Sequence, residues 1–268
     1  TLLITFVLSI LLFDIKMSEG NDDSDYIEGA FKLSKNLSSY YNAKAPLYPL
    51  ILSLPVKLFG INLFILKGLS MLFSLVHLIT LYYAFRKLIP FVVLFSVMFF
   101  VAVNNQFLYY ASQTYSEAFF CMLQGLFFLS LRPILKNENS ERISLIKYLI
   151  VGFVLTLLTF TKNISIGAIG ALIVYFILIK DFKKLGYVLL SFISFRFLFE
   201  LVKYFVWGST NQFSSQYQIL IQKDPYDASK GVDDFFGFLS RLQSNTVIYL
   251  GKRLYQILGF MSSDEQTP

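Results

Sequence analysis

Four carboxylates stand close together near the start of the chain, in the stretch GNDDSDYIEGA: Asp22, Asp23, Asp25 and Glu28. They follow an apolar run, Thr1 to Phe13, that contains no charged residue. A carboxylate can accept the proton of a hydroxyl group when its pKa lies near the working pH. Clustered carboxylates also suit a hard divalent cation. A divalent metal is therefore one candidate cofactor, and the residues do not specify which cofactor, if any, is bound. The alternative for these residues is a solvated acidic loop with no chemical role.

An acid and a base stand at two turns further along the chain. Glu117 begins an apolar run after the turn SQTYSE, and Lys162 separates two apolar runs within TFTKNIS. If Glu117 has no chemical role, its position is explained by the helix dipole, whose positive end favours an acid at the start of a helix. Lys162 would extend its charged group along its apolar stem into water. If both face the compartment of Asp22, they add a second acid and a phosphate-binding cation to the same site.

Three charges lie inside the last long apolar run, within FRFLFELVKYF: Arg196, Glu200 and Lys203. Their spacings of four and three residues place them on one helix face. Charges within a membrane span normally face a bundle interior or a water-filled cavity. One interpretation is an Arg196–Glu200 ion pair that holds the bundle together and leaves Lys203 available for a phosphate. The other assigns Arg196 to the phosphate site as well.

The composition indicates a membrane protein. Of the 268 residues, 56% are hydrophobic and only 15% are charged, whereas soluble proteins average about 25% charged residues. The apolar residues form long unbroken runs, which predicts an all-α, polytopic bundle of transmembrane helices. The net charge of +6 comes from basic residues in short turns rather than on one surface, so nucleic acid is not an expected partner. A single cysteine, Cys121, excludes a disulfide within the chain and a cysteine-based zinc cluster.

The apolar runs predict about seven spans, the first of them cut short: residues 1–13, 61–85, 88–103, 117–131, 148–160, 164–179 and 185–207. Residues 1–207 then form one transmembrane module, with a long external loop at 14–61. Residues 208–268 are expected to begin an extracytoplasmic or juxtamembrane region, and both ends of the chain look truncated.

The positive-inside rule orients these spans. Nine lysines and arginines fall in three short turns: Arg86, Lys87, Arg132, Lys136, Arg142, Lys147, Lys180, Lys183 and Lys184. The opposite turns hold only Lys162. This distribution requires that residues 46–60 do not cross the membrane, which predicts an interfacial helix there. The acids of the first loop then face the outside.

The order of short motifs resembles the GT-C superfamily of integral-membrane glycosyltransferases. DDSDYIEGAFKL is similar to the acidic motif of its first external loop, and APLYPLILSLPVKLFG to the segment that follows. The bacterial branch is the most similar, with its relatives of dolichyl-phosphate-mannose–protein mannosyltransferase and of the lipid A aminoarabinose transferase. The resemblance places Asp22 at the catalytic acid, with Asp23 beside it, and Glu117 at the second acid. Lys67 matches a basic position at which arginine is more usual, and Lys162 matches another.

Together the residues and the resemblance imply an inverting glycosyltransferase of a bacterial inner membrane. Its donor would be a polyprenyl-phosphate sugar, and its acceptor a hydroxyl of a lipid, glycan or protein on the extracytoplasmic face. One of Asp22, Asp23 and Asp25 would be the general base, and Lys162, Lys203 and Arg196 would bind the donor phosphate. The sugar and the acceptor are not specified. The alternatives are a non-catalytic flippase or polysaccharide-export protein, and a ligase that joins glycan chains.

Overall fold

The structure is a computed structural model, and it describes residues 1–14, 22–39, 45–136, 144–208, 221–224 and 227–254. Within these ranges the chain is helical and contains no β-strand beyond one isolated bridge between Gln222 and Val232. The predicted all-α class is therefore confirmed for the part of the chain that is described.

The long helices follow the predicted apolar runs. They are α1 (Leu2–Leu11), α4 (Leu63–Phe85), α5 (Phe91–Val103), α7 (Ser116–Lys136), α8 (Leu145–Thr161), α9 (Ile166–Leu178) and α10 (Phe182–Trp207). The other described helices are α2 (Asp22–Lys35), α3 (Leu47–Phe59), α6 (Asn105–Ala111) and α12 (Phe235–Val247), with short turns η1 (Leu37–Ser39), η3 (Asn163–Ser165), η4 (Ala228–Lys230) and η5 (Ile248–Lys252).

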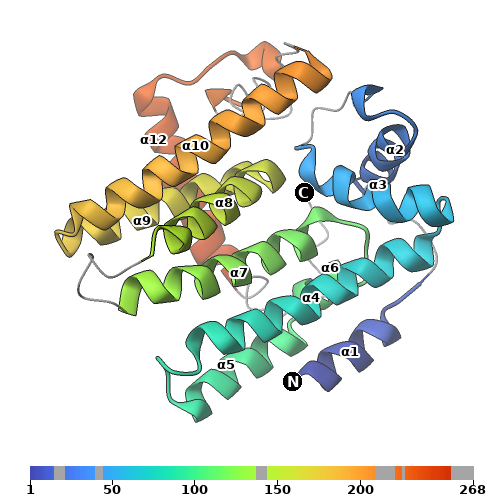
Figure 1. Ribbon diagram of the computed structural model, residues 1–268, viewed down its shortest axis with the longest axis horizontal. Coiled ribbons are helices and arrows are strands. Elements are labelled where there is room, and N and C mark those ends of the chain that lie inside the picture. Colours follow the sequence, from blue (N-terminus) through green and yellow to red (C-terminus); the bar gives the residue numbers. More distant parts are fainter. Residues whose placement is uncertain (15–21, 40–44, 137–143, 209–220, 225–226, 255–268) are drawn as a thin grey trace.

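Four helices form the central row of the bundle. Helix α4 packs along α7, α7 along α8, and α8 along α10, while α1 and α5 lie against α4 (Figure 1). Helices α2 and α3 pack on each other at the end of the row where α4 and α7 begin and α10 ends (Figure 1). The Trp207 indole N–H donates a 2.6 Å hydrogen bond to the Leu37 carbonyl, which joins the end of α10 to the first loop.

Two glycines allow neighbouring helices in this row to approach closely. A Cβ added to Gly125 on α7 would overlap the Thr80 hydroxyl on α4, and one added to Gly152 on α8 would overlap Ser191 on α10. Small residues at helix contacts are typical of membrane proteins, in which close packing rather than water exclusion drives helix association.

Three described helices are long and apolar enough to cross a membrane: α4, residues 116–135 of α7, and α10. Helices α5 and α6 qualify together as a fourth span with a bend of 61° between them. The remaining apolar helices, among them α1, α8 and α9, are shorter. Helix α4, with 23 residues, is about 34 Å long at 1.5 Å per residue, which matches a hydrocarbon core of about 30 Å. The chain is therefore a membrane protein by helix length and composition.

The structure corrects the local interpretation of two segments. Residues 22–35 were expected in a polar loop, but they form helix α2. The acids of its first turn are favoured by the helix dipole, and its apolar residues Tyr26, Ile27, Ala30 and Leu33 recur at helical spacing on the buried face. Residues 104–116 were expected as a polar turn, but most of this segment forms α6, which the Asn104 side chain caps through the Phe107 amide.

Candidate functional site

The three aspartates of α2 lie in different environments. Asp23 is buried, with 1% of its surface exposed, and its carboxylate accepts a hydrogen bond from the Ser24 amide at 2.8 Å. Asp22 is exposed at the first position of the helix, and Asp25 is half-buried. An acceptor hydroxyl can therefore reach Asp22 directly, whereas Asp23 lies within the packed protein.

A hydrogen bond joins this acidic helix to the start of α7. The Tyr26 and Ser116 hydroxyls lie 2.9 Å apart and are buried. Tyr26 also packs edge-on against Tyr48 of α3, with ring centroids 5.0 Å apart. Burial raises the pKa of Tyr48 above its usual range, and the nearby charges of Glu117 and Asp23 add to this rise. The Tyr26–Ser116 hydrogen bond therefore places the acidic helix α2 beside the turn that carries Glu117.

Glu117 and Lys162 form an ion pair between α7 and the end of α8. The Lys162 Nζ and the Glu117 Oε1 are 2.5 Å apart, and about a quarter to a third of each side chain is exposed. The other carboxylate oxygen of Glu117 is buried and accepts no hydrogen bond from the described residues. This pair brings together two residues that are 45 positions apart in the chain.

Three tyrosines surround this acidic end of the bundle. The rings of Tyr109, Tyr110 and Tyr115 contact one another, with centroids 5.3–6.1 Å apart. Tyr115 directly precedes Ser116 and Glu117, so the cluster lies beside the second acid. Tyrosine offers an apolar face with a polar tip, so this cluster provides a surface suited to a sugar ring. No motif in the sequence predicted this cluster, although three tyrosines stand close together in FLYYASQTYSE.

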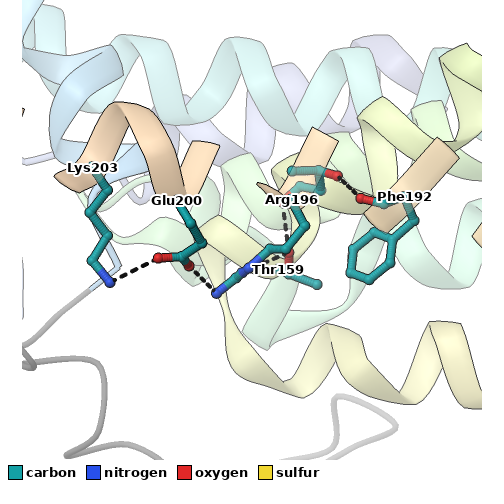
Figure 2. A network of polar contacts seen from close by, with 6 residues as sticks. Thr159, Phe192, Arg196, Glu200 and Lys203 are labelled. Carbon is teal, nitrogen blue, oxygen red and sulfur yellow. Dashed lines mark hydrogen bonds and ion pairs between the residues drawn. The ribbon is translucent and has the colours of Figure 1, made fainter. Parts of the chain in front are cut away.

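The charges of α10 form a second cluster, shown in Figure 2. The Glu200 carboxylate lies 2.7 Å from Arg196 and 3.3 Å from Lys203. The Arg196 guanidinium also donates to the Thr159 hydroxyl of α8 at 3.4 Å and lies over the Phe160 ring at 4.3 Å. The predicted common face and the Arg196–Glu200 pair are confirmed. The expectation that Lys203 is left over from this pair is wrong, because Glu200 contacts both cations.

The three cations predicted to bind phosphate thus fall into two groups. Arg196 and Lys203 share the Glu200 carboxylate. Lys162 is neutralised by Glu117 instead. The groups lie on neighbouring turns of α8, because Thr159 contacts Arg196 and Lys162 follows three residues later.

An apolar groove begins a few residues beyond the Glu117–Lys162 pair and runs along the bundle. It has a volume of about 480 Å³ and lies between α7 and α9, with Leu158 of α8 among its lining residues. On α7 it extends from Phe120 to Leu135, about 22 Å along the helix axis. Its other wall begins at Ile164 and Ser165 of η3, directly after Lys162, and continues along α9 to Tyr175.

A further ion pair lies at the same end of the bundle. The Lys67 Nζ is 2.6 Å from the Asp14 carboxylate, and only 1% of the Lys67 side chain is exposed. This contact ties the end of α1 to the first turns of α4, on either side of the acidic segment. The motifs indicated Lys67 but not Asp14. Asp14 directly follows the first apolar run, and this position could have indicated it.

The described residues do not complete a metal site of protein ligands. No group of three His, Cys, Asp or Glu side chains gathers closely enough within those ranges to hold a metal ion. Within those ranges a divalent cation therefore has no set of three carboxylate, imidazole or thiolate ligands.

Comparison of the chain with protein-family models, with curated proteins and with solved structures finds no match. The class that the fold defines is a helical membrane protein with an acidic site at one end of its bundle. The resemblance to glycosyltransferases stays a prediction from the motifs.

Proposed function

We propose that this protein is an inverting membrane glycosyltransferase that moves a sugar from a polyprenyl phosphate to an acceptor hydroxyl. The observation that carries the proposal is the convergence of the acidic helix α2 with the Glu117–Lys162 pair at the start of α7, through the Tyr26–Ser116 hydrogen bond, near one end of an apolar groove. This arrangement supplies a carboxylate for an acceptor, a cation for a phosphate and an apolar surface for a lipid chain. The enzyme acts on the extracytoplasmic face of a bacterial inner membrane.

Asp22 is the general base in this mechanism, because it is the exposed aspartate of α2. It accepts the proton of the acceptor hydroxyl while the hydroxyl oxygen forms a bond to the anomeric carbon. The bond from that carbon to the phosphate oxygen breaks on the opposite side, and its electron pair leaves with the lipid phosphate. The configuration at the anomeric carbon inverts, and no covalent enzyme intermediate forms.

Cations stabilise the charge that develops on the leaving phosphate. Lys162 lies two residues before Ile164, which lines the α7–α9 groove, and Arg196 and Lys203 of α10 are the further cations. Glu117 holds Lys162 before the donor binds, and the phosphate then shares that cation. The groove accommodates part of the polyprenyl chain, since its length of about 20 Å covers most of a hydrocarbon core of about 30 Å.

The proposed topology has seven crossings, with α2 and α3 lying at the outer surface. Residues Tyr40 and Asn105 then share the outer compartment, and Lys136 lies inside. Single cysteines at these positions in a Cys121→Ser background are expected to react with a membrane-impermeant thiol reagent in intact cells at the first two sites only. Reaction at position 136 with protection at position 105 would reverse the orientation.

The function is tested by the lipids that accumulate when the protein is absent. Membrane extracts of a deletion strain should contain a polyprenyl-phosphate sugar at several times its normal level, because its consumer is missing. The wild-type gene should restore the normal level, and Asp22→Asn should not. Unchanged lipid-phosphate sugars in the deletion strain would refute the proposed donor.

A further inference from the structure

The end of the bundle opposite the acids carries a second apolar groove beside a group of basic residues. Helix α4 begins at the acidic end and finishes at Phe85, about 34 Å away along its axis. Arg86 and Lys87 follow directly and are exposed. They therefore lie at the level of the lipid headgroups on the other face of the membrane.

The groove has a volume of about 620 Å³ between the last turns of α4, the first turns of α5 and the start of α1. Its lining is apolar and aromatic, with Ile79, Phe91 and Phe95 among its walls. Tyr82 and Tyr83 line it at the end nearest Arg86. An acyl chain fits a lining of this kind, since it needs apolar contact and no hydrogen bond.

The basic residues at the mouth of this groove are held in place by aromatic and backbone contacts. The Arg86 guanidinium lies 4.6 Å from the Tyr83 ring centroid and 5.8 Å from that of Tyr82. Arg132 of α7 donates a 2.9 Å hydrogen bond to the Tyr83 carbonyl. None of Arg86, Lys87 and Arg132 pairs with a carboxylate in the described part of the chain. Their charge is therefore not neutralised by an acid of the described residues.

We propose that this groove is a binding site for an anionic phospholipid. One acyl chain lies between α4 and α5, and the phosphate lies on Arg86, with Lys87 and Arg132 nearby. The charge of the lipid complements the cations, and the tyrosine rings hold Arg86 at the headgroup level. Basic pockets between membrane helices bind anionic headgroups in this way. The site is independent of sugar transfer, since it lies at the other end of α4 from the acids.

Photocrosslinking tests the proposal on the whole protein in lipid nanodiscs. Phosphatidylglycerol and phosphatidylcholine analogues, each with the same diazirine-bearing acyl chain, are compared, and crosslinked peptides are identified by mass spectrometry. Phosphatidylglycerol is expected to label residues 78–98 about five-fold more than phosphatidylcholine, since one cation near a phosphate is worth about 1 kcal/mol. Arg86→Gln should remove most of this preference. Equal labelling by the two lipids would overturn the proposal.

Two further variants separate the site from general surface charge. Lys180→Gln removes one positive charge from the same membrane face without touching the groove, and it should leave the preference unchanged. Ile79→Trp fills the groove and should reduce labelling of residues 78–98 by both lipids. The proposal fails if Lys180→Gln acts as strongly as Arg86→Gln, or if Ile79→Trp leaves the labelling unchanged. Size-exclusion profiles and thermal stability of each variant show that it is folded.

Discussion

Asp22→Asn is expected to lower sugar transfer by about 10²–10⁴-fold, the usual contribution of a general base, in a protein that still folds and inserts. Asparagine keeps the size and polarity of the side chain but cannot accept a proton at neutral pH. Asp22 is exposed on the first turn of α2, so its replacement should change the free energy of unfolding by no more than about 0.5 kcal/mol. The measurement is turnover of purified full-length protein with the accumulated lipid-phosphate sugar as donor.

The neighbouring aspartates supply matched controls for this result. Asp23 is buried and bonded to a backbone amide, so Asp23→Asn should lower thermal stability by about 1–3 kcal/mol as well as activity. Asp25→Asn should cause a milder loss of turnover with normal stability. Donor binding should survive in the Asp22 variant, because the phosphate contacts lie elsewhere. If all three asparagine variants kept full turnover, α2 would have no catalytic role, and a non-catalytic export or flippase protein would be the better interpretation.

Glu200→Ala is expected to destabilise the protein more than any other substitution in the α10 cluster, by about 2–3 kcal/mol. Glu200 contacts both Arg196 and Lys203, so its removal takes away the carboxylate that offsets two positive charges on a membrane helix. The cost of a charge within a span is of this size on insertion scales. The side chains of Arg196 and Glu200 are 35% and 40% exposed, which keeps the cost below that of a fully buried pair. Unfolding by SDS in mixed micelles measures it.

The single cation variants distinguish this network from a simple pair. Arg196→Ala leaves Glu200 in contact with Lys203, and Lys203→Ala leaves it with Arg196, so each should cost less than Glu200→Ala. Arg196→Ala should be the more costly of the two, since it also removes the contacts with Thr159 and Phe160. Lys203→Ala should mainly weaken donor binding. Equal and small effects of Glu200→Ala and Lys203→Ala would show that the cluster contributes nothing to stability.

The membrane class and most helices could be predicted because they depend on local composition. A run such as residues 61–85 forms a helix in lipid whatever its neighbours are, since a span must satisfy its backbone hydrogen bonds within itself. The same local argument placed Arg196, Glu200 and Lys203 on one face, because helical spacing alone decides it. Helix α2 was missed because its sequence is mostly polar and has no long apolar run. The helical spacing of Tyr26, Ile27, Ala30 and Leu33 was the local pattern that could have indicated it.

For the candidate site, the sequence by itself determined which residue types were available: the acids at 22, 23, 25 and 117, and the cations at 162, 196 and 203. Tertiary structure decided their relations. It buries Asp23, exposes Asp22 and pairs Lys162 with Glu117. The contacts of Glu200 with Arg196 and Lys203 instead follow from spacings of four and three residues on α10. The physical reason is that burial and the Glu117–Lys162 pair depend on which helices pack together. Two of these helix contacts, α4 with α7 and α8 with α10, form at the close approaches of Gly125 and Gly152, which leave no periodic signal in the chain.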